Sequence, residues 1–383
     1  MDTNKLKNPR IENIKFVTNV VIKGLFLFGV LNVLFAYLQP LPLLGKISAY
    51  NILFPGRMRL PYGDNPDLSY NLTLTQLDAM FATHEIEARS KNPDEYRVLM
   101  IGDSSTWGFL LQPTETISGQ LNSLNFTFPD GRLLRSYNLG YPGMSLAKDV
   151  LILSYALRFQ PDLIIWFVTL ESFPLSKQLS SPILSNNPLY TKRLFQKLDL
   201  RLNPDGSNLK NASFCNNTII GQRQIIADMI RLQFYGLMWA ATGIDQYIPQ
   251  EYTPRIENLT REVDFYDQKP PHLDQKKLAF DILEAGLKIS GDIPLLFVNE
   301  PVFISQGENS DIRYNFYYPR WAYNDYREMF NAFCSEHGAH CVDIWNVIEP
   351  SEFTNTAIHM TARGTLKTTH LILPTILQIA NEN

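Results

Sequence analysis

A small polar cluster follows an apolar run near residue 100 and contains a candidate nucleophile. Residues 97–101 have strand composition, and Gly102, Asp103 and Ser104 come directly after them. In an open parallel α/β sheet, sites form where strands end, because the next helix begins there with free backbone N–H groups. Ser104 is therefore either a nucleophile or simply the N-cap of the following helix, a position where Ser is common.

A serine becomes nucleophilic only when a base accepts its proton, so a histidine near the same sheet edge is needed. His359, in TNTAIHMTARG, follows the last predicted strand and precedes a helix-like segment. A single loop histidine is more often structural, and His370 is a poorer candidate because it lies inside the terminal helix pattern. Ser104 and His359 together predict acyl transfer through an acyl-enzyme.

The elements that must position these residues are five apolar runs of strand length, at residues 97–101, 133–138, 163–168, 294–298 and 341–345. Segments long enough for crossover helices separate them. This alternation predicts a parallel sheet with helices on both faces. The gap after the third strand is too long for one crossover and predicts an insertion at about 174–271.

Three blocks resemble those of the SGNH (GDSL-type) hydrolases: IGDSSTWG, NLGYPGMS and HMTARG, in the family's order. The resemblance covers residues 96–379 without the insertion and implies a flavodoxin-like three-layer α/β/α fold. It also implies that Ser104 is the nucleophile, that His359 is the base, and that the backbone N–H groups of Ser104 and Gly140 are oxyanion donors. A glycine suits that last role because an amide without a Cβ can approach an alkoxide closely, although Gly140 is equally typical of an ordinary turn.

The third block departs from the family pattern. Where the family has an Asn donor, PDLIIWFVTLESF has Glu171, whose carboxylate would repel an oxyanion. Either Thr169 or Ser172 donates instead, or the hole has fewer donors, which costs on the order of a hundredfold in rate per donor. We assign Asp103 and Glu171 to substrate binding.

The triad acid is a second departure. Thr356 stands three residues before His359, where the family has Asp, and Asn355 precedes it. An amide oxygen can fix the imidazole tautomer, as Asn does in papain-like sites. Asp343 and Glu352 are the other candidates, and the sequence leaves the choice among the four open.

An apolar stretch near the N-terminus predicts a membrane anchor. Residues 16–38 are interrupted only by Lys23 and are long enough to span a bilayer, whereas a cleaved signal peptide has a shorter apolar core followed by small residues. More basic residues precede the stretch than follow it closely, which favours a cytoplasmic N-terminus. The basic residues before it are Lys5, Lys7, Arg10 and Lys15, and those after it are Lys46, Arg57 and Arg59. The expected parts are a cytoplasmic tail (1–15), the anchor (16–38), a membrane-proximal linker and helix (39–95) and an extracytoplasmic hydrolase-like domain (96–383).

A second apolar segment, residues 226–244, carries Asp228 and Arg231 near its start. These charges disfavour a span and predict a helix that is either buried or at the membrane surface. Aromatic residues in this insertion and in the run 314–323 are suited either to stacking on sugar rings or to the core.

Composition excludes several classes. A net charge of −4 offers no basic face for nucleic acid. Three cysteines without C-x-x-C spacing, and His337 and His340 without further ligands, predict neither a metal site nor a cofactor. Cys334 and Cys341 are close enough in sequence to form a disulfide in an oxidising compartment, or they are two buried thiols.

The anchor and the altered third block together resemble accessory proteins of cell-envelope polymer acylation, of the alginate O-acetylation and teichoic acid D-alanylation type. That resemblance implies an esterase or O-acyltransferase acting on acyl esters of a surface glycan, with an acyl donor or acylated glycan as ligand and a multispanning membrane O-acyltransferase as partner. The alternative is a catalytically degenerate scaffold or binding protein with the same fold. A lipid-acting esterase is supported by membrane proximity alone.

Overall fold

The computed structural model describes residues 9–44, 47, 49–54, 76–81, 84–87, 90–202 and 213–382. Much of the predicted linker and most of the predicted cytoplasmic tail lie outside these residues, as do five of the basic residues used to predict orientation, namely Lys5, Lys7, Lys46, Arg57 and Arg59.

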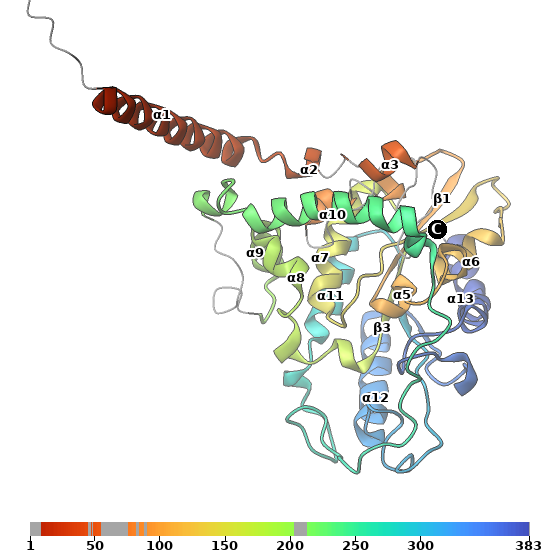
Figure 1. Ribbon diagram of the computed structural model, residues 1–383. Coiled ribbons are helices and arrows are strands. Elements are labelled where there is room, and N and C mark those ends of the chain that lie inside the picture. Colours follow the sequence, from red (N-terminus) through yellow and green to blue (C-terminus); the bar gives the residue numbers. More distant parts are fainter. Residues whose placement is uncertain are drawn as a thin grey trace, which may run out of the picture.

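A five-stranded parallel sheet with the order β2-β1-β3-β4-β5 forms the centre of the protein (Figure 1). The strands are β1 (Glu95–Ile101), β2 (Leu133–Asn138), β3 (Leu163–Val168), β4 (Leu295–Asn299) and β5 (His340–Asp343). This is the flavodoxin-like strand order, so the predicted fold class is confirmed. β2 and β3 coincide with their predicted runs, and the other strands begin or end at slightly different residues.

The sheet has helices on both faces because both faces of its central strands are apolar. Leu99 and Ile101 of β1 pack toward α7 (Leu146–Ala156), α11 (Phe280–Ser290) and α12 (Arg320–His337). Val98 and Met100 point the other way, toward α6 (Ile117–Ser123) and α13 (Ala362–Glu382). A strand buried on both sides reads as a continuous apolar run, which is why β1 and β3 were recognisable in the sequence.

Shorter helices surround this core. Before β1 lie α2 (Leu41–Leu44), α3 (Ala49–Leu53) and α4 (Leu77–Phe81), and α5 (Ser104–Trp107) follows β1. The chain between β3 and β4 holds, before α11, the helices α8 (Pro182–Asn186), α9 (Pro188–Leu198) and α10 (Arg223–Thr242) and several 3₁₀ turns, among them η6 (Phe214–Asn217). α8 and α9 pack on α7, whereas α10 packs on α3. In the run 314–323, Tyr314, Tyr318 and Tyr323 are buried in the core, so the core interpretation holds for them.

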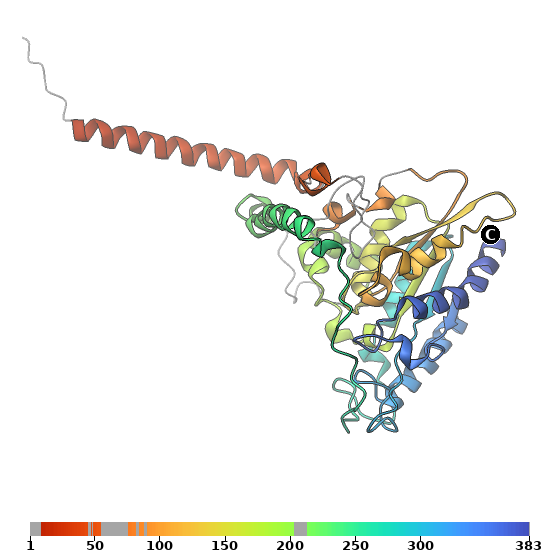
Figure 2. The same cartoon turned by 45° about the vertical axis from the view of Figure 1, so that its right-hand side comes forward.

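The N-terminal helix α1 (Pro9–Leu38) extends away from the rest of the protein (Figures 1 and 2). Its segment Glu12–Leu38 has a mean hydropathy of 2.1 with only 11% of its most apolar part buried, and among the described residues it is the one helix long and apolar enough to cross a membrane. A core helix would be buried, whereas this one exposes apolar side chains on all sides.

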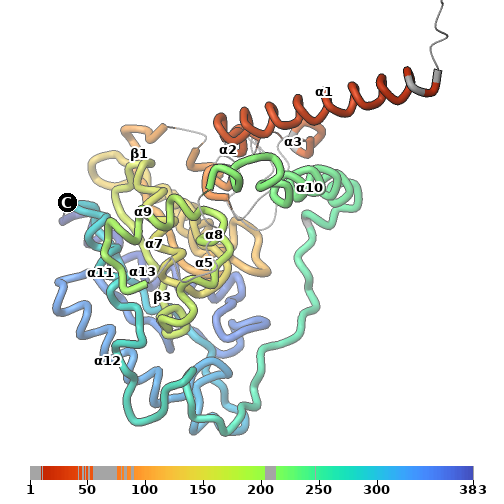
Figure 3. Tube along the Cα trace, turned by 90° about the vertical axis from the view of Figure 1, so that its left-hand side faces the viewer, coloured from red at the N-terminus to blue at the C-terminus, as the bar shows by residue number. Residues whose placement is uncertain are grey.

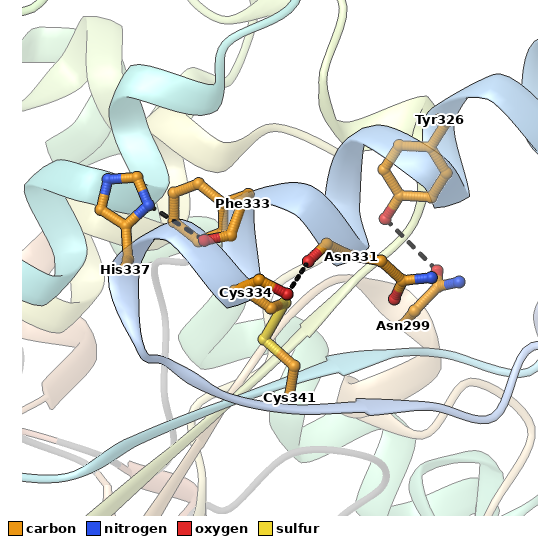
Figure 4. Close-up of a disulfide and its surroundings, with 8 residues drawn as sticks. Asn299, Tyr326, Asn331, Phe333, Cys334, His337 and Cys341 are labelled. Atoms are coloured by element: carbon orange, nitrogen blue, oxygen red, sulfur yellow. Dashed lines mark hydrogen bonds between the residues drawn. A yellow bond between two sulfur atoms is a disulfide. The ribbon is translucent and has the colours of Figure 1, made fainter.

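Cys334 and Cys341 form a disulfide, with their Cα atoms 6.2 Å apart, that joins the end of α12 to β5 (Figure 4). Gly338, in the left-handed region with φ 57°, ends α12 between them. A disulfide is the form expected in an oxidising compartment.

His337 Nδ1 lies 3.0 Å from the carbonyl oxygen of Phe333, and among the described residues no group of His, Cys, Asp and Glu side chains is arranged to hold a metal.

We expect the double variant Cys334→Ser, Cys341→Ser to unfold more easily. Opening this short loop restores chain entropy to the unfolded state and lowers the free energy of unfolding by about 2 kcal/mol. Urea unfolding of the detergent-solubilised protein, followed by circular dichroism, measures the change. Cys215→Ser is the control, because Cys215 is free and exposed; an equal loss in the control, or none in the double variant, would contradict the stabilising role of the bridge.

Candidate active site

Ser104 is the first residue of α5, but it is not the residue that caps this helix. Asp103 is the N-cap, and its Oδ1 accepts a hydrogen bond of 2.8 Å from the backbone N–H of Ser105. Ser104 Oγ instead lies 2.8 Å from His359 Nε2. The structure therefore brings together the two residues that the sequence singled out, although they are 255 positions apart.

Asn355 completes a chain of three polar side chains. Its Oδ1 lies 2.8 Å from His359 Nδ1. Because an amide oxygen only accepts, Nδ1 carries the proton and Nε2 is left to accept from the Ser104 hydroxyl. A nucleophile bonded to a base, whose other nitrogen is held by a third group, is the arrangement of serine-hydrolase triads.

The other candidates for the third group do not contact the imidazole. Thr356 Oγ1 accepts from the backbone N–H groups of Ile358 and His359, at 3.3 and 3.2 Å, so it shapes the turn that carries the histidine. The expectation that Thr356 acts as a triad member is therefore corrected. Asp343 and Glu352 are bonded elsewhere, to Arg327 and Asn299 and to Thr361 respectively.

His359 sits in a dry environment. It is 7% exposed, and the ring of Phe109 stacks on it with a centroid distance of 4.8 Å. Burial disfavours the charged imidazolium and lowers the pKa of His359 from 6.5 to about 4. The imidazole is therefore neutral, and able to accept a proton, at any pH well above 4.

Two of the expected oxyanion donors are already bonded. The Gly140 N–H donates to Asn138 Oδ1 at 3.0 Å, and the buried Thr169 hydroxyl is 2.9 Å from the Tyr318 hydroxyl. A Cβ at Gly140 would lie 2.4 Å from the backbone nitrogen of Trp107, so this glycine is required for close packing against α5. The Ser104 N–H, at the first helical position, has no partner within its helix.

The two acidic residues assigned to substrate binding have internal partners instead. Asp103 is 4% exposed and caps α5. Glu171 is 7% exposed, pairs with Lys177 Nζ at 2.7 Å and accepts from the Tyr266 hydroxyl. The Glu171 charge is largely compensated by Lys177, and substrate binding by either residue stays a prediction.

A buried charged cluster supports the nucleophile loop, and sequence reasoning missed it. Lys148 Nζ donates to the Gly102 carbonyl at 2.8 Å and to Asp149 Oδ1 at 2.5 Å. Glu300, directly after β4, is 1% exposed and lies close to Asp103. Burial, together with the nearby charge of Asp103, raises the pKa of Glu300 well above its usual value. The available signals were a Lys-Asp pair in an otherwise apolar helix and an acidic residue at a strand's carboxyl end.

An apolar cavity of about 440 Å³ lies beside Phe109 and therefore beside the histidine. Its walls come from the end of α5 and the loop after it, from Trp239 of α10 and from the segment after α10; the lining residues are Trp107, Phe109, Leu110, Leu111, Trp239, Ile244, Asp245, Tyr247, Ile248 and Pro249. A more polar cleft of about 510 Å³ shares Leu110, Leu111 and residues 247–249 with this cavity and is also lined by Gln112, Glu115 and Thr354. The site thus adjoins one apolar and one polar space.

No family model matches the sequence, and no curated protein matches it either. The structure is similar to a carbohydrate acetylesterase family member from Sinorhizobium meliloti, with 12% identity, a TM-score of 0.32, and 74% of this chain and 98% of that chain covered. It is also similar to a lipolytic protein of the G-D-S-L family from Veillonella parvula, with 9% identity, a TM-score of 0.35, and 73% and 96% covered.

We expect Phe109→Ala to raise the pKa of His359 from about 4 toward its ordinary value of 6.5, because water then reaches the imidazole. Histidine-labelled protein titrated by NMR measures this directly, with His359→Gln identifying the signal. Phe109→Leu is the matched control, since it keeps an apolar cover and should leave the pKa low. An unchanged pKa in Phe109→Ala would show that Phe109 does not keep the histidine dry.

Proposed function

We propose that this protein is a membrane-anchored serine esterase or O-acyltransferase of the SGNH type. Ser104 is the nucleophile, His359 the general base and acid, and Asn355 the residue that orients the imidazole. The observation that carries the proposal is the continuous hydrogen-bond chain Ser104–His359–Asn355, with 2.8 Å at each contact.

The reaction proceeds through an acyl-enzyme. Ser104 Oγ attacks the ester carbonyl while its proton passes to His359 Nε2. The tetrahedral intermediate collapses, the bond to the leaving alcohol breaks, and that alcohol takes the proton from Nε2. Water or a sugar hydroxyl then attacks the acyl group and gives its proton to Nε2, and Ser104 leaves with that proton.

We expect the proposed reaction to be slow compared with that of a serine hydrolase that has a complete triad and oxyanion hole. A neutral amide at Asn355 fixes the imidazole but does not stabilise imidazolium as a carboxylate does. The Ser104 N–H is the donor we assign to the oxyanion, while the Gly140 amide and the Thr169 hydroxyl have other partners. Each missing donor costs on the order of a hundredfold in rate. The catalytically inert scaffold stays as the alternative, because these two occupied donors favour it.

The substrate class follows from the two spaces beside the site. The apolar cavity suits the acyl part of an ester, and the polar cleft suits the hydroxyl-bearing part. A surface glycan as acceptor, and a multispanning O-acyltransferase as partner, rest on the sequence resemblance. Whether water or a sugar hydroxyl resolves the acyl-enzyme depends on how well the occupied site excludes water.

The location is part of the proposal. α1 anchors the chain in the cell membrane with its N-terminus inside and the hydrolase-like domain extracytoplasmic. The apolar length of α1 supports a span, and the Cys334–Cys341 disulfide supports an oxidising compartment.

Intact-protein mass after fluorophosphonate treatment tests the proposal. We expect one adduct on the full-length, detergent-solubilised protein, none on Ser104→Ala, and an unchanged adduct on Ser123→Ala, because Ser123 is remote on α6 and its hydroxyl bonds only within that helix. The reason is that a fluorophosphonate reacts with an activated serine hydroxyl. If the native protein stays unlabelled where a known serine esterase is fully labelled, the scaffold alternative replaces the enzyme.

Substitutions at Asn355 test the orienting role through the rate of labelling. Asn355→Ala removes the acceptor of the Nδ1 proton and should slow labelling about 10- to 100-fold, the size of a single positioned-group contribution. Asn355→Asp supplies a carboxylate at the same place, stabilises imidazolium and should label at least as fast as the native protein. Equal rates in all three proteins would remove Asn355 from the mechanism.

A further inference from the structure

Helix α10 presents an exposed apolar face. Ile230, Phe234 and Met238 recur every fourth residue, so they lie on one side of the helix, and they are 55%, 64% and 61% exposed. The opposite side is buried: Met229 and Ala240 pack with Tyr50 of α3. Large side chains this exposed, in a row on one helix, indicate a surface that is covered by a partner.

The turn that leads into α10 touches the apolar helix α1. Asn32 of α1 is 7% exposed, and its Oδ1 accepts a hydrogen bond of 3.1 Å from the Ile220 N–H. Asn32 lies six residues before Leu38, which is about 9 Å along a helix with 1.5 Å rise per residue. The turn therefore sits beside the last turns of the segment that is apolar enough to span a bilayer, and Phe214 and Ile220, in and after η6, are each 55% exposed there.

The direction of α10 fits a bilayer surface. Figure 2 views α10 nearly along its axis while α1 is seen at full length, so the two helices cross instead of running parallel. Figure 3 shows α10 at the edge of the protein on the side toward which α1 extends. A membrane crossed by α1 would therefore meet this edge, with α10 lying close to the membrane plane.

We infer that α10 and the preceding turn, residues 214–242, are a second membrane contact that lies in the outer interface of the bilayer. Ile230, Phe234 and Met238 insert among the acyl chains. Arg223 and Arg231, both exposed on the same helix, reach lipid phosphates, and Asp228 pairs with Arg231 at 3.1 Å. An apolar stripe flanked by arginines is the pattern of interfacial helices, which bury their apolar side about 5–10 Å deep. This inference rests on the proposed anchoring by α1.

Docking of α10 would place the site at the membrane. Trp239, near the end of α10, and Ile244, just after it, line the apolar cavity beside Phe109. The cavity then lies close to the headgroups, where an ester with an apolar acyl group is presented by the bilayer itself. The inference thereby narrows the proposed substrate to amphiphilic acyl esters at the membrane surface.

Depth-dependent quenching tests the contact. Phe234→Cys and Met238→Cys are made separately in full-length protein carrying Cys215→Ser, labelled with an environment-sensitive fluorophore and reconstituted in phosphatidylcholine–phosphatidylglycerol vesicles. Lys269→Cys is the control, because its side chain is 76% exposed and lies outside the proposed contact. Nitroxides on shallow acyl positions should remove more than half of the emission at positions 234 and 238, with a blue shift, and leave position 269 unchanged.

The outcomes separate the proposals. Vesicle flotation reports anchoring by α1; protein that does not float overturns the anchor and this inference with it. Floating protein whose label at 234 is unquenched overturns the α10 contact alone. A blue-shifted label that lipid nitroxides do not quench also overturns it, since a protein partner then covers the face. Fluorophosphonate labelling of the same samples reports Ser104 independently, so failure of the enzyme proposal is distinguished from both.

Discussion

The hydrogen bond between Ser104 Oγ and His359 Nε2 is the contact on which the proposed chemistry depends, and it joins the end of β1 to a loop near the C-terminus. Such a contact survives only if both loops are rigid. The first is fixed by Asp103, which caps α5, and by Lys148, which holds the Gly102 carbonyl. The second is fixed by a hydrogen bond of 2.8 Å from the Thr354 N–H to the His359 carbonyl.

Rigidity at the first loop is obtained with buried charge, which is costly unless it is compensated. Lys148 and Asp149 neutralise each other, and burial raises the pKa of Asp149 to about 6. Asp103 keeps a backbone donor from Ser105, while burial and the nearby charge of Asp103 raise the pKa of Glu300 well above its usual value. The loop that carries Ser104 is thus held by buried charged groups, of which Lys148 and Asp149 form a direct ion pair.

The fold was predictable because its signals are local. Strands such as β1 and β3 are continuous apolar runs, and the polar residues after them mark the active edge of the sheet. Ser104 and His359 were predictable for the same reason, since both lie next to recognisable elements. In a parallel sheet the carboxyl ends of all strands lie at the same edge. Residues that follow different strands can therefore be predicted to lie near one another without knowing how the side chains pack.

Partner choice in the site was not predictable, because it depends on distances of a few tenths of an ångström between side chains far apart in sequence. Asn355 and Thr356 are neighbours, yet only Asn355 reaches the imidazole while Thr356 turns back to its own backbone. The sequence predicted that the Glu171 carboxylate would repel an oxyanion, whereas in the structure Lys177 pairs with this carboxylate. The partners of the donors expected at Gly140 and Thr169, which are Asn138 and Tyr318, were unpredictable for the same reason.

The dryness that keeps His359 neutral also raises the cost of the step in which it becomes charged. A pKa shift from 6.5 to about 4 corresponds to roughly 3 kcal/mol against imidazolium. Asn355 offers only a dipole to offset this, and the cost applies to both formation and resolution of the acyl-enzyme, because His359 accepts a proton in each step. The apolar ring of Phe109 that covers His359 also hinders water from reaching the acyl-enzyme. On the proposed function, an acceptor hydroxyl bound in the polar cleft would compete with water for the acyl-enzyme, and the outcome depends on how well the occupied site excludes water.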